Sequence, residues 1–141
     1  MNQEIPNVPG SDAVVAWFGE WPSFHDAEIL ELHLDRENVS WVKVHVWLSS
    51  GETYEHNGKQ YRRERHGVVT FRLAEIVDLE LYDSSCQNVI FGLELERKAG
   101  AYRPLMKPCY GLSGYIEAGR IELEVTPHIR THGDPLSSPN P

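Results

Sequence analysis

Apolar and polar residues alternate with a period of two in six separate runs, and no other feature of this sequence constrains the fold so strongly. Successive side chains of a β-strand point to opposite faces, so each run predicts a strand with one buried face. The apolar members of the runs are Leu30, Leu32 and Leu34; Val42, Val44, Val46 and Leu48; Val69, Phe71 and Leu73; Val77, Leu79 and Leu81; Val89, Phe91, Leu93 and Leu95; and Ile121, Leu123 and Val125. The sequence therefore predicts a mainly β protein.

One short helix is predicted near the N-terminus. Ser11 or Asp12 can cap its first turn, and Gly19 followed by Pro22 ends it. Its apolar face consists of Val14, Val15, Trp17 and Phe18. A helix of about two turns is not stable alone, so it must pack against the strands.

The second face of the predicted strands is not purely polar. Trp41, Trp47 and Val68 point away from the apolar face, so another element must cover part of them. The short helix is one candidate for this cover, and a second sheet is the other. We therefore expect an antiparallel sandwich or strongly curved sheet with one short N-terminal helix.

Two of the runs allow sharper predictions. Pairing Leu32 with Val42 and Leu30 with Val44 places the leucines and valines of the first two runs on one face of a hairpin. The fifth run is expected to be a central strand whose apolar residues share one buried face. On this interpretation Phe91→Ala lowers the free energy of unfolding by about 3–5 kcal/mol.

The length and composition are those of one globular domain. The chain has 141 residues, of which 40% are hydrophobic and 10% aromatic. Residues 1–10 contain two prolines and predict an extended N-terminal arm, and residues 131–141 predict a flexible Pro/Ser-rich tail. Residues 11–130 are left as a single β-rich domain.

The sequence also indicates a cellular compartment. The first ten residues do not resemble a signal peptide, and the apolar runs are shorter than the ~20 residues of a membrane helix. Cys86 and Cys109 are too few for a disulfide framework or a cysteine-rich metal site. We therefore expect a cytoplasmic protein that does not bind membranes.

The formal net charge of −8 argues against nucleic acid as a partner, because phosphate contacts need a surplus of Lys and Arg on one face. The acidic balance suits a basic protein partner, and it also suits plain solubility.

The residues do not form a recognisable catalytic or metal-binding motif. His25 and Asp26 are adjacent and suggest an acid–base pair or half of a metal site, but neighbours on an extended chain point to opposite sides. The alternative is that Asp26 or Ser23 bonds the local backbone. The other histidines lack the i, i+2 or i, i+4 spacing of ligand pairs, apart from His128 and His132, which Pro127 and Gly133 keep from sharing a helix. We therefore predict no catalytic residues, no cofactor and no metal.

The most polar internal stretch, residues 51–66, combines basic and aromatic side chains. It is either a partner-binding loop or a solvated hairpin tip that turns at Asn57-Gly58. The residues expected to contact a partner here are Tyr54, Tyr61, Arg62 and Arg63. The competing surface is an acidic outer face formed by Glu75, Asp78, Glu80 and Asp83.

Five strings of the sequence together resemble the immunity protein 50 family of polymorphic-toxin systems. They are FGEWPSFHDAEILELHLDR (Phe18–Arg36), VKVHVWL, VTFRLAEIVDLEL, QNVIFGLELER and the closing YGLSGYIEA with IELEVTP. The resemblance spans roughly Trp17 to Pro127. It implies a non-catalytic bacterial protein that neutralises a cognate toxin, and it assigns no toxin-binding residue.

Two other functions remain open from the residues alone. One is a sandwich module that binds a small molecule or glycan on exposed tryptophan and tyrosine rings, and burial of Trp21, Trp41 and Trp47 would argue against it. The other is a metal-dependent or acid–base enzyme that uses His25 and Asp26.

Overall fold

The computed structural model describes residues 5–128, without the side chains of residues 49–51, 62, 63 and 98. One helix and six strands follow one another along the chain: α1 (Ser11–Phe18), β1 (Ala27–His33), β2 (Ser40–His56), β3 (Lys59–Tyr82), β4 (Val89–Lys98), β5 (Ala101–Tyr110) and β6 (Ser113–Pro127). The predicted tail, residues 131–141, lies outside the described residues. Within the described part of the chain, no helix has the length and apolarity needed to cross a membrane.

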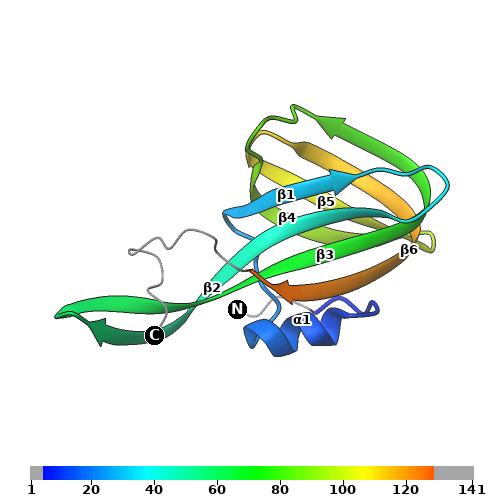
Figure 1. Ribbon diagram of the computed structural model, residues 1–141. Coiled ribbons are helices and arrows are strands. Elements are labelled where there is room, and N and C mark those ends of the chain that lie inside the picture. The colour runs from blue at the N-terminus through cyan, green and yellow to red at the C-terminus, as the bar shows by residue number, and fades with distance from the viewer. Residues whose placement is uncertain (1–4, 129–141) are drawn as a thin grey trace.

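All six strands are antiparallel neighbours, and they close into a barrel in the order β1-β2-β3-β6-β5-β4 (Figure 1). The expected class, a mainly β protein with a strongly curved antiparallel sheet and one short helix, is confirmed. The barrel closes through a short seam between β1 and β4, which consists of the pairs Ala27–Ile90 and Glu28–Val89. β3 is the longest strand and pairs with β2 on one side and β6 on the other.

The barrel interior is the hydrophobic core. Three of the predicted runs supply inward-facing side chains that are almost inaccessible to solvent: Val42, Val44 and Val46 of β2, Val69, Phe71 and Leu73 of β3, and Ile121 and Leu123 of β6. Burial of this kind stabilises the fold by roughly 1.5–3 kcal/mol per large apolar side chain. The period of two therefore identifies the inner face of these strands correctly.

The predicted inner face of β1 is wrong at Leu30 because a β-bulge interrupts the strand. Ile29 pairs with Val44 and Glu31 pairs with Lys43, so Leu30 is an extra residue on β1. Leu30 is 46% exposed, whereas Ile29 is buried. The predicted pairing of Leu32 with Val42 is confirmed, and the predicted pairing of Leu30 with Val44 is wrong. One inserted residue reverses the faces on one side of a bulge.

Register shifts also make the predictions for β4 and β3 wrong, at Phe91 and at Val77. Ile90 pairs with Pro108 and Gly92 pairs with Lys107, so Phe91 is an extra residue. Phe91 is 58% exposed, and Ile90 takes its place in the core. On β3 the register shifts around Val77, which is 64% exposed.

Helix α1 forms where it was predicted and lies against one end of the barrel (Figure 1). Gly10, rather than Ser11 or Asp12, occupies the N-cap position. Gly19 ends the helix, as predicted, and has a left-handed conformation. The Trp17 indole N–H donates to the carbonyl of His66 at 3.0 Å, and the Trp17 ring touches Gly67. Gly67 has the same parity as the inward-facing residues of β3, so the helix packs at the mouth of the core. The main contacts of α1 are with β6 and β3, whereas Trp41 and Trp47 lie on β2, so α1 is not the cover predicted for these two side chains.

Candidate functional site

The long strands β2 and β3 continue beyond the barrel as a two-stranded ribbon (Figure 1). β6 pairs with β3 only from Gly67 onward, and the pairing of β1 with β2 reaches only to His45. We call residues 49–64 the projecting hairpin. Its turn is Asn57-Gly58, with φ of 51° and 76°, which is the geometry that Asn-Gly favours in two-residue hairpins. The predicted turn at Asn57-Gly58 is therefore confirmed.

The projecting hairpin brings the predicted aromatic contact residues together. Tyr54 and Tyr61 are cross-strand partners, and their rings stack with centroids 5.6 Å apart. Both side chains are half-buried. The backbone of Arg62 pairs with Thr53, whereas the side chains of Arg62 and Arg63 lie outside the described residues.

The competing acidic residues, Glu75, Asp78, Glu80 and Asp83, are all exposed and lie toward the other end of β3. Asp78 accepts a hydrogen bond from the Tyr115 hydroxyl at 2.8 Å, and this bond raises the pKa of Tyr115. At a strand rise of about 3.3 Å per residue, Asp78 lies roughly 50 Å along β3 from Arg62. The two predicted partner surfaces are therefore separate.

His25 and Asp26 meet, contrary to the expectation that they point to opposite sides. Their Nδ1 and Oδ2 atoms are 3.2 Å apart, with both side chains about half exposed. The chain is not extended here, because Phe24 and Asp26 each have a φ of 62°. Ser23 Oγ accepts the backbone N–H of His25, as the local-backbone alternative predicts. Among the residues that the structure describes, no third metal-ligating group joins this pair.

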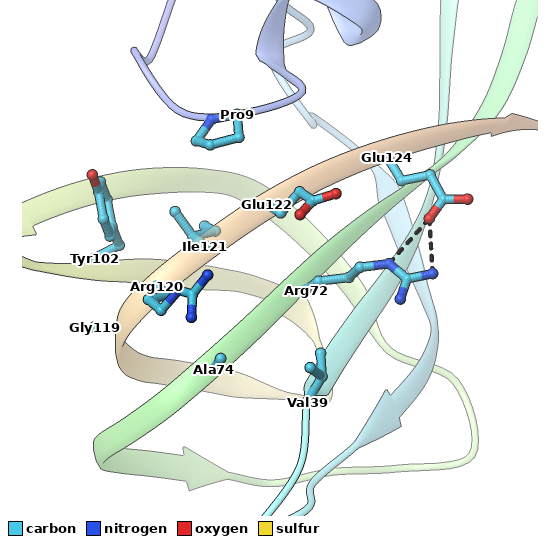
Figure 2. A pocket seen from close by; sticks show the side chains of 10 residues that line it. All are labelled: Pro9, Val39, Arg72, Ala74, Tyr102, Gly119, Arg120, Ile121, Glu122 and Glu124. Atoms are coloured by element: carbon cyan, nitrogen blue, oxygen red, sulfur yellow. Dashed lines mark hydrogen bonds and ion pairs between the residues drawn. The ribbon is translucent and has the colours of Figure 1, made fainter.

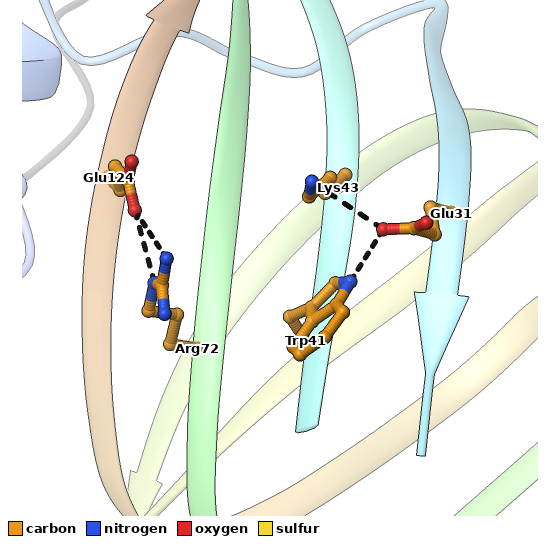
Figure 3. A network of polar contacts seen from close by, with 5 residues as sticks. All are labelled: Glu31, Trp41, Lys43, Arg72 and Glu124. Carbon is orange, nitrogen blue, oxygen red and sulfur yellow. Dashed lines mark hydrogen bonds and ion pairs between the residues drawn. The ribbon is translucent and has the colours of Figure 1, made fainter. Parts of the chain in front are cut away.

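A polar network covers part of the outer face of the barrel (Figure 3). The Glu31 carboxylate accepts the indole N–H of Trp41 and lies 3.6 Å from Lys43 Nζ. The bond from Trp41, the larger cause, and the nearby Lys43 charge both lower the pKa of Glu31. The Trp41 ring stacks on His33 with centroids 4.0 Å apart. The contacts with Glu31 and His33 therefore fix the position of the Trp41 side chain.

A pocket lies between Pro9, β3 and β6 (Figure 2). Its charged lining residues are Arg72, Arg120, Glu122 and Glu124. Arg72 already forms an ion pair with Glu124 at 2.9 Å. Equal numbers of acidic and basic groups leave this pocket without a net charge to attract an ionic ligand.

One cluster of candidate metal ligands was not predicted from the sequence. His45, His66 and His128 lie within reach of a common point on the outer face, at the root of the projecting hairpin. Their sequence separations follow no metal-binding motif. The register of the paired strands brings the three histidines together. The side chains of His45 and His66 point to the same face of the sheet, and His128 is the residue after Pro127, which pairs with Gly67.

Several residues of the strings that carry the family resemblance hold the fold together. Trp21 and Phe24 are buried and pack edge to face, and Phe24 packs on Phe71. Comparison with family models, curated proteins and solved structures finds no match to this chain. The resemblance to the immunity protein 50 family therefore stays a prediction.

Proposed function

We propose that this protein is a non-catalytic cytoplasmic protein that neutralises a cognate bacterial toxin and binds it through the projecting hairpin. The observation that carries the binding role is that the ends of β2 and β3 extend beyond the barrel, which closes through the other parts of these strands. The identity of the partner class rests on the sequence resemblance alone.

The physical properties of the projecting hairpin suit a binding element. An isolated two-stranded ribbon is marginally stable in water, so a partner that covers it adds stability. The free edges of such a ribbon offer backbone groups to an added strand. Tyrosine is enriched among the residues that dominate binding energy, and the hairpin presents Tyr54 and Tyr61 as one stacked pair.

Neither alternative function has comparable support. A glycan platform needs open aromatic faces, but Trp21 is buried and Trp41 is stacked on His33. An enzyme that uses His25 and Asp26 needs further groups around this pair, and the described residues supply no third ligand there.

The proposal is tested by co-expression with the product of the adjacent gene in a bacterial growth assay. The unchanged protein is expected to restore growth, and the Tyr54→Ala/Tyr61→Ala variant is expected to lose this protection. Loss of a central aromatic contact costs about 2 kcal/mol or more, which corresponds to roughly 30-fold faster dissociation.

Tyr110→Ala is the matched control, because Tyr110 is 58% exposed on β5 and lies outside the projecting hairpin. This variant is expected to protect as well as the unchanged protein. Equal protection by all variants would place the binding surface elsewhere, and failure to bind any neighbouring gene product would refute the toxin-neutralising role.

A further inference from the structure

Three imidazole rings from three neighbouring strands meet at the root of the projecting hairpin. His45 belongs to β2, His66 to β3, and His128 directly follows β6. One ring nitrogen of each lies within 4.8 Å of those of the other two. His45 Nε2 is 3.0 Å from His66 Nδ1, and the rings of His45 and His128 stack with centroids 3.7 Å apart.

These distances are close to those of a bound metal ion. With Zn–N bonds of about 2.0–2.1 Å and tetrahedral angles, two ligand nitrogens lie about 3.3 Å apart. The His45–His66 pair is already near this separation. The ligand atoms of all three residues already lie within 4.8 Å of one another. The His128 ring is stacked on His45, so it must rotate about its side-chain bonds to direct a lone pair at the same point.

The surroundings of the cluster are those of a built site rather than of three surface histidines. His45 is only 8% exposed, and the Nε2 atom of His66 and the Nδ1 atom of His128 are inaccessible to solvent. The Trp47 ring packs beside His45 and His66. Packing of this kind limits the freedom of the three rings.

Glu64 supplies an outer partner for one of the rings. Its Oε1 atom lies 3.7 Å from His66 Nε2, on the far side of the ring from His45. A carboxylate at this nitrogen favours the tautomer with the proton on Nε2, which leaves the Nδ1 lone pair directed at the centre of the cluster.

We propose that His45, His66 and His128 bind one Zn²⁺ ion. Three imidazoles and a fourth, exchangeable position form a tetrahedral set that zinc accepts. The ion would join β2, β3 and β6 where the projecting hairpin leaves the barrel.

The proposal is tested on full-length protein without a polyhistidine tag, after treatment with a chelator. Calorimetric titration with ZnCl₂ is expected to show one ion per chain, and titration with CoCl₂ is expected to give the intense visible absorption of tetrahedral Co²⁺. Zinc is expected to raise the melting temperature, because it binds the folded state.

His128→Gln is the informative variant, because His128 follows the last residue of β6 and its loss leaves the barrel core intact. Substitution of an outer-shell residue typically weakens metal binding by about 10–100-fold. The loss of the ligand His128 is expected to weaken zinc binding by more than this. Glu64→Gln is expected to weaken binding by about 10-fold. His56→Gln, at the exposed hairpin tip, is the matched control and is expected to leave the affinity unchanged.

Two results would overturn the proposal. One is the absence of zinc and cobalt binding by the unchanged protein. The other is equal zinc affinity in the His128→Gln and His56→Gln variants, which would assign any bound ion to adventitious surface contacts. Circular dichroism of each variant confirms that it is folded before the affinities are compared.

Discussion

Asn88 and Leu112 are joined by a hydrogen bond of 2.8 Å, in which the side-chain Oδ1 of Asn88 accepts the backbone N–H of Leu112. The same Oδ1 accepts the N–H of Ser85, and the Asn88 Nδ2 donates to the carbonyl of Ser85. The backbone carbonyl of Asn88 accepts the N–H of Ile29. One residue thus ties together the segments that precede β4 and β6 and the strand β1.

Replacement of Asn88 by alanine is expected to destabilise the fold. Three side-chain hydrogen bonds are lost, each worth a net of about 0.5–1.5 kcal/mol, so the free energy of unfolding falls by roughly 2–4 kcal/mol. Urea denaturation measures this loss. Gln87→Ala, at the exposed neighbouring position, is expected to change it by less than about 0.5 kcal/mol, and equal losses in both variants would contradict the role of Asn88.

The bulge on β4 predicts opposite outcomes for two adjacent residues. Ile90 is fully buried, so Ile90→Ala is expected to cost about 2–5 kcal/mol of unfolding free energy. Phe91→Ala is expected to cost less than about 1 kcal/mol, because more than half of its side chain is already in solvent. Chemical denaturation of both variants measures these losses of unfolding free energy. A larger loss for Phe91→Ala than for Ile90→Ala would show that Phe91, and not Ile90, is the core residue.

The loop between β1 and β2 predicts a contribution to stability that depends on pH. The Asp35 carboxylate accepts the backbone N–H groups of Glu37 and Asn38, and these bonds lower the pKa of Asp35 below its ordinary value of 3.8. A lowered folded-state pKa adds stability that is fully present above the ordinary pKa and is lost as the pH falls through the folded one.

The measurement compares the protein with its Asp35→Asn variant from pH 6 to pH 2. The variant is expected to be less stable at pH 6, with the difference shrinking as the pH falls through the folded pKa of Asp35. Glu37→Gln, in the same exposed loop, serves as the control. An Asp35 pKa at or above 3.8 by nuclear magnetic resonance titration would contradict the assignment.

The projecting hairpin is expected to be dispensable for folding. Residues Thr53 to Arg62 of β2 and β3 pair with each other, and the pairings of these strands with β1 and β6 do not include them. A variant in which residues 50–63 are replaced by Asn-Gly is expected to unfold at nearly the same urea concentration and to lose toxin neutralisation. A shortened protein that neutralises as well as the original would exclude the hairpin as the contact surface.

Salt dependence separates the two predicted partner surfaces. Tyr61→Ala is expected to increase mainly the dissociation rate constant of the toxin complex. Charge reversal at Asp78 and Glu80 is expected to change mainly the association rate and its dependence on ionic strength. Kinetic measurements at two salt concentrations distinguish these effects. A large rise in dissociation on charge reversal would move the contact to the acidic face.

The period of two predicts the inner face of β2, β6 and the first half of β3 correctly. The Asn-Gly pair correctly predicts the turn at residues 57 and 58. It fails at Leu30, Val77 and Phe91, because a bulge inserts one residue without disturbing the local alternation. Only the pairing with the partner strand reveals the insertion, so the alternation alone does not show which residues face the core at a bulge.

The histidine cluster could not be predicted from the sequence for a related reason. His66 and His128 are brought together by the pairing of β3 with β6, whose register is fixed by contacts between residues far apart in the chain. The sequence spacing of the three histidines holds no trace of that register. Closure of the barrel by the short pairing of β1 with β4 was likewise not derivable from the alternation.

The continuity of β3 has a mechanical consequence. This 24-residue strand carries the projecting hairpin at one end and is hydrogen-bonded to β6 along most of the rest. Tension at the hairpin tip acts along the strand axis, perpendicular to these bonds, so many of them share the load at once. Pulling from Asn57 is therefore expected to need a higher rupture force than peeling β1 from β4, where the bonds of two residue pairs break in turn. A force that a bound partner exerts on the hairpin is therefore shared by the hydrogen bonds between β3 and β6.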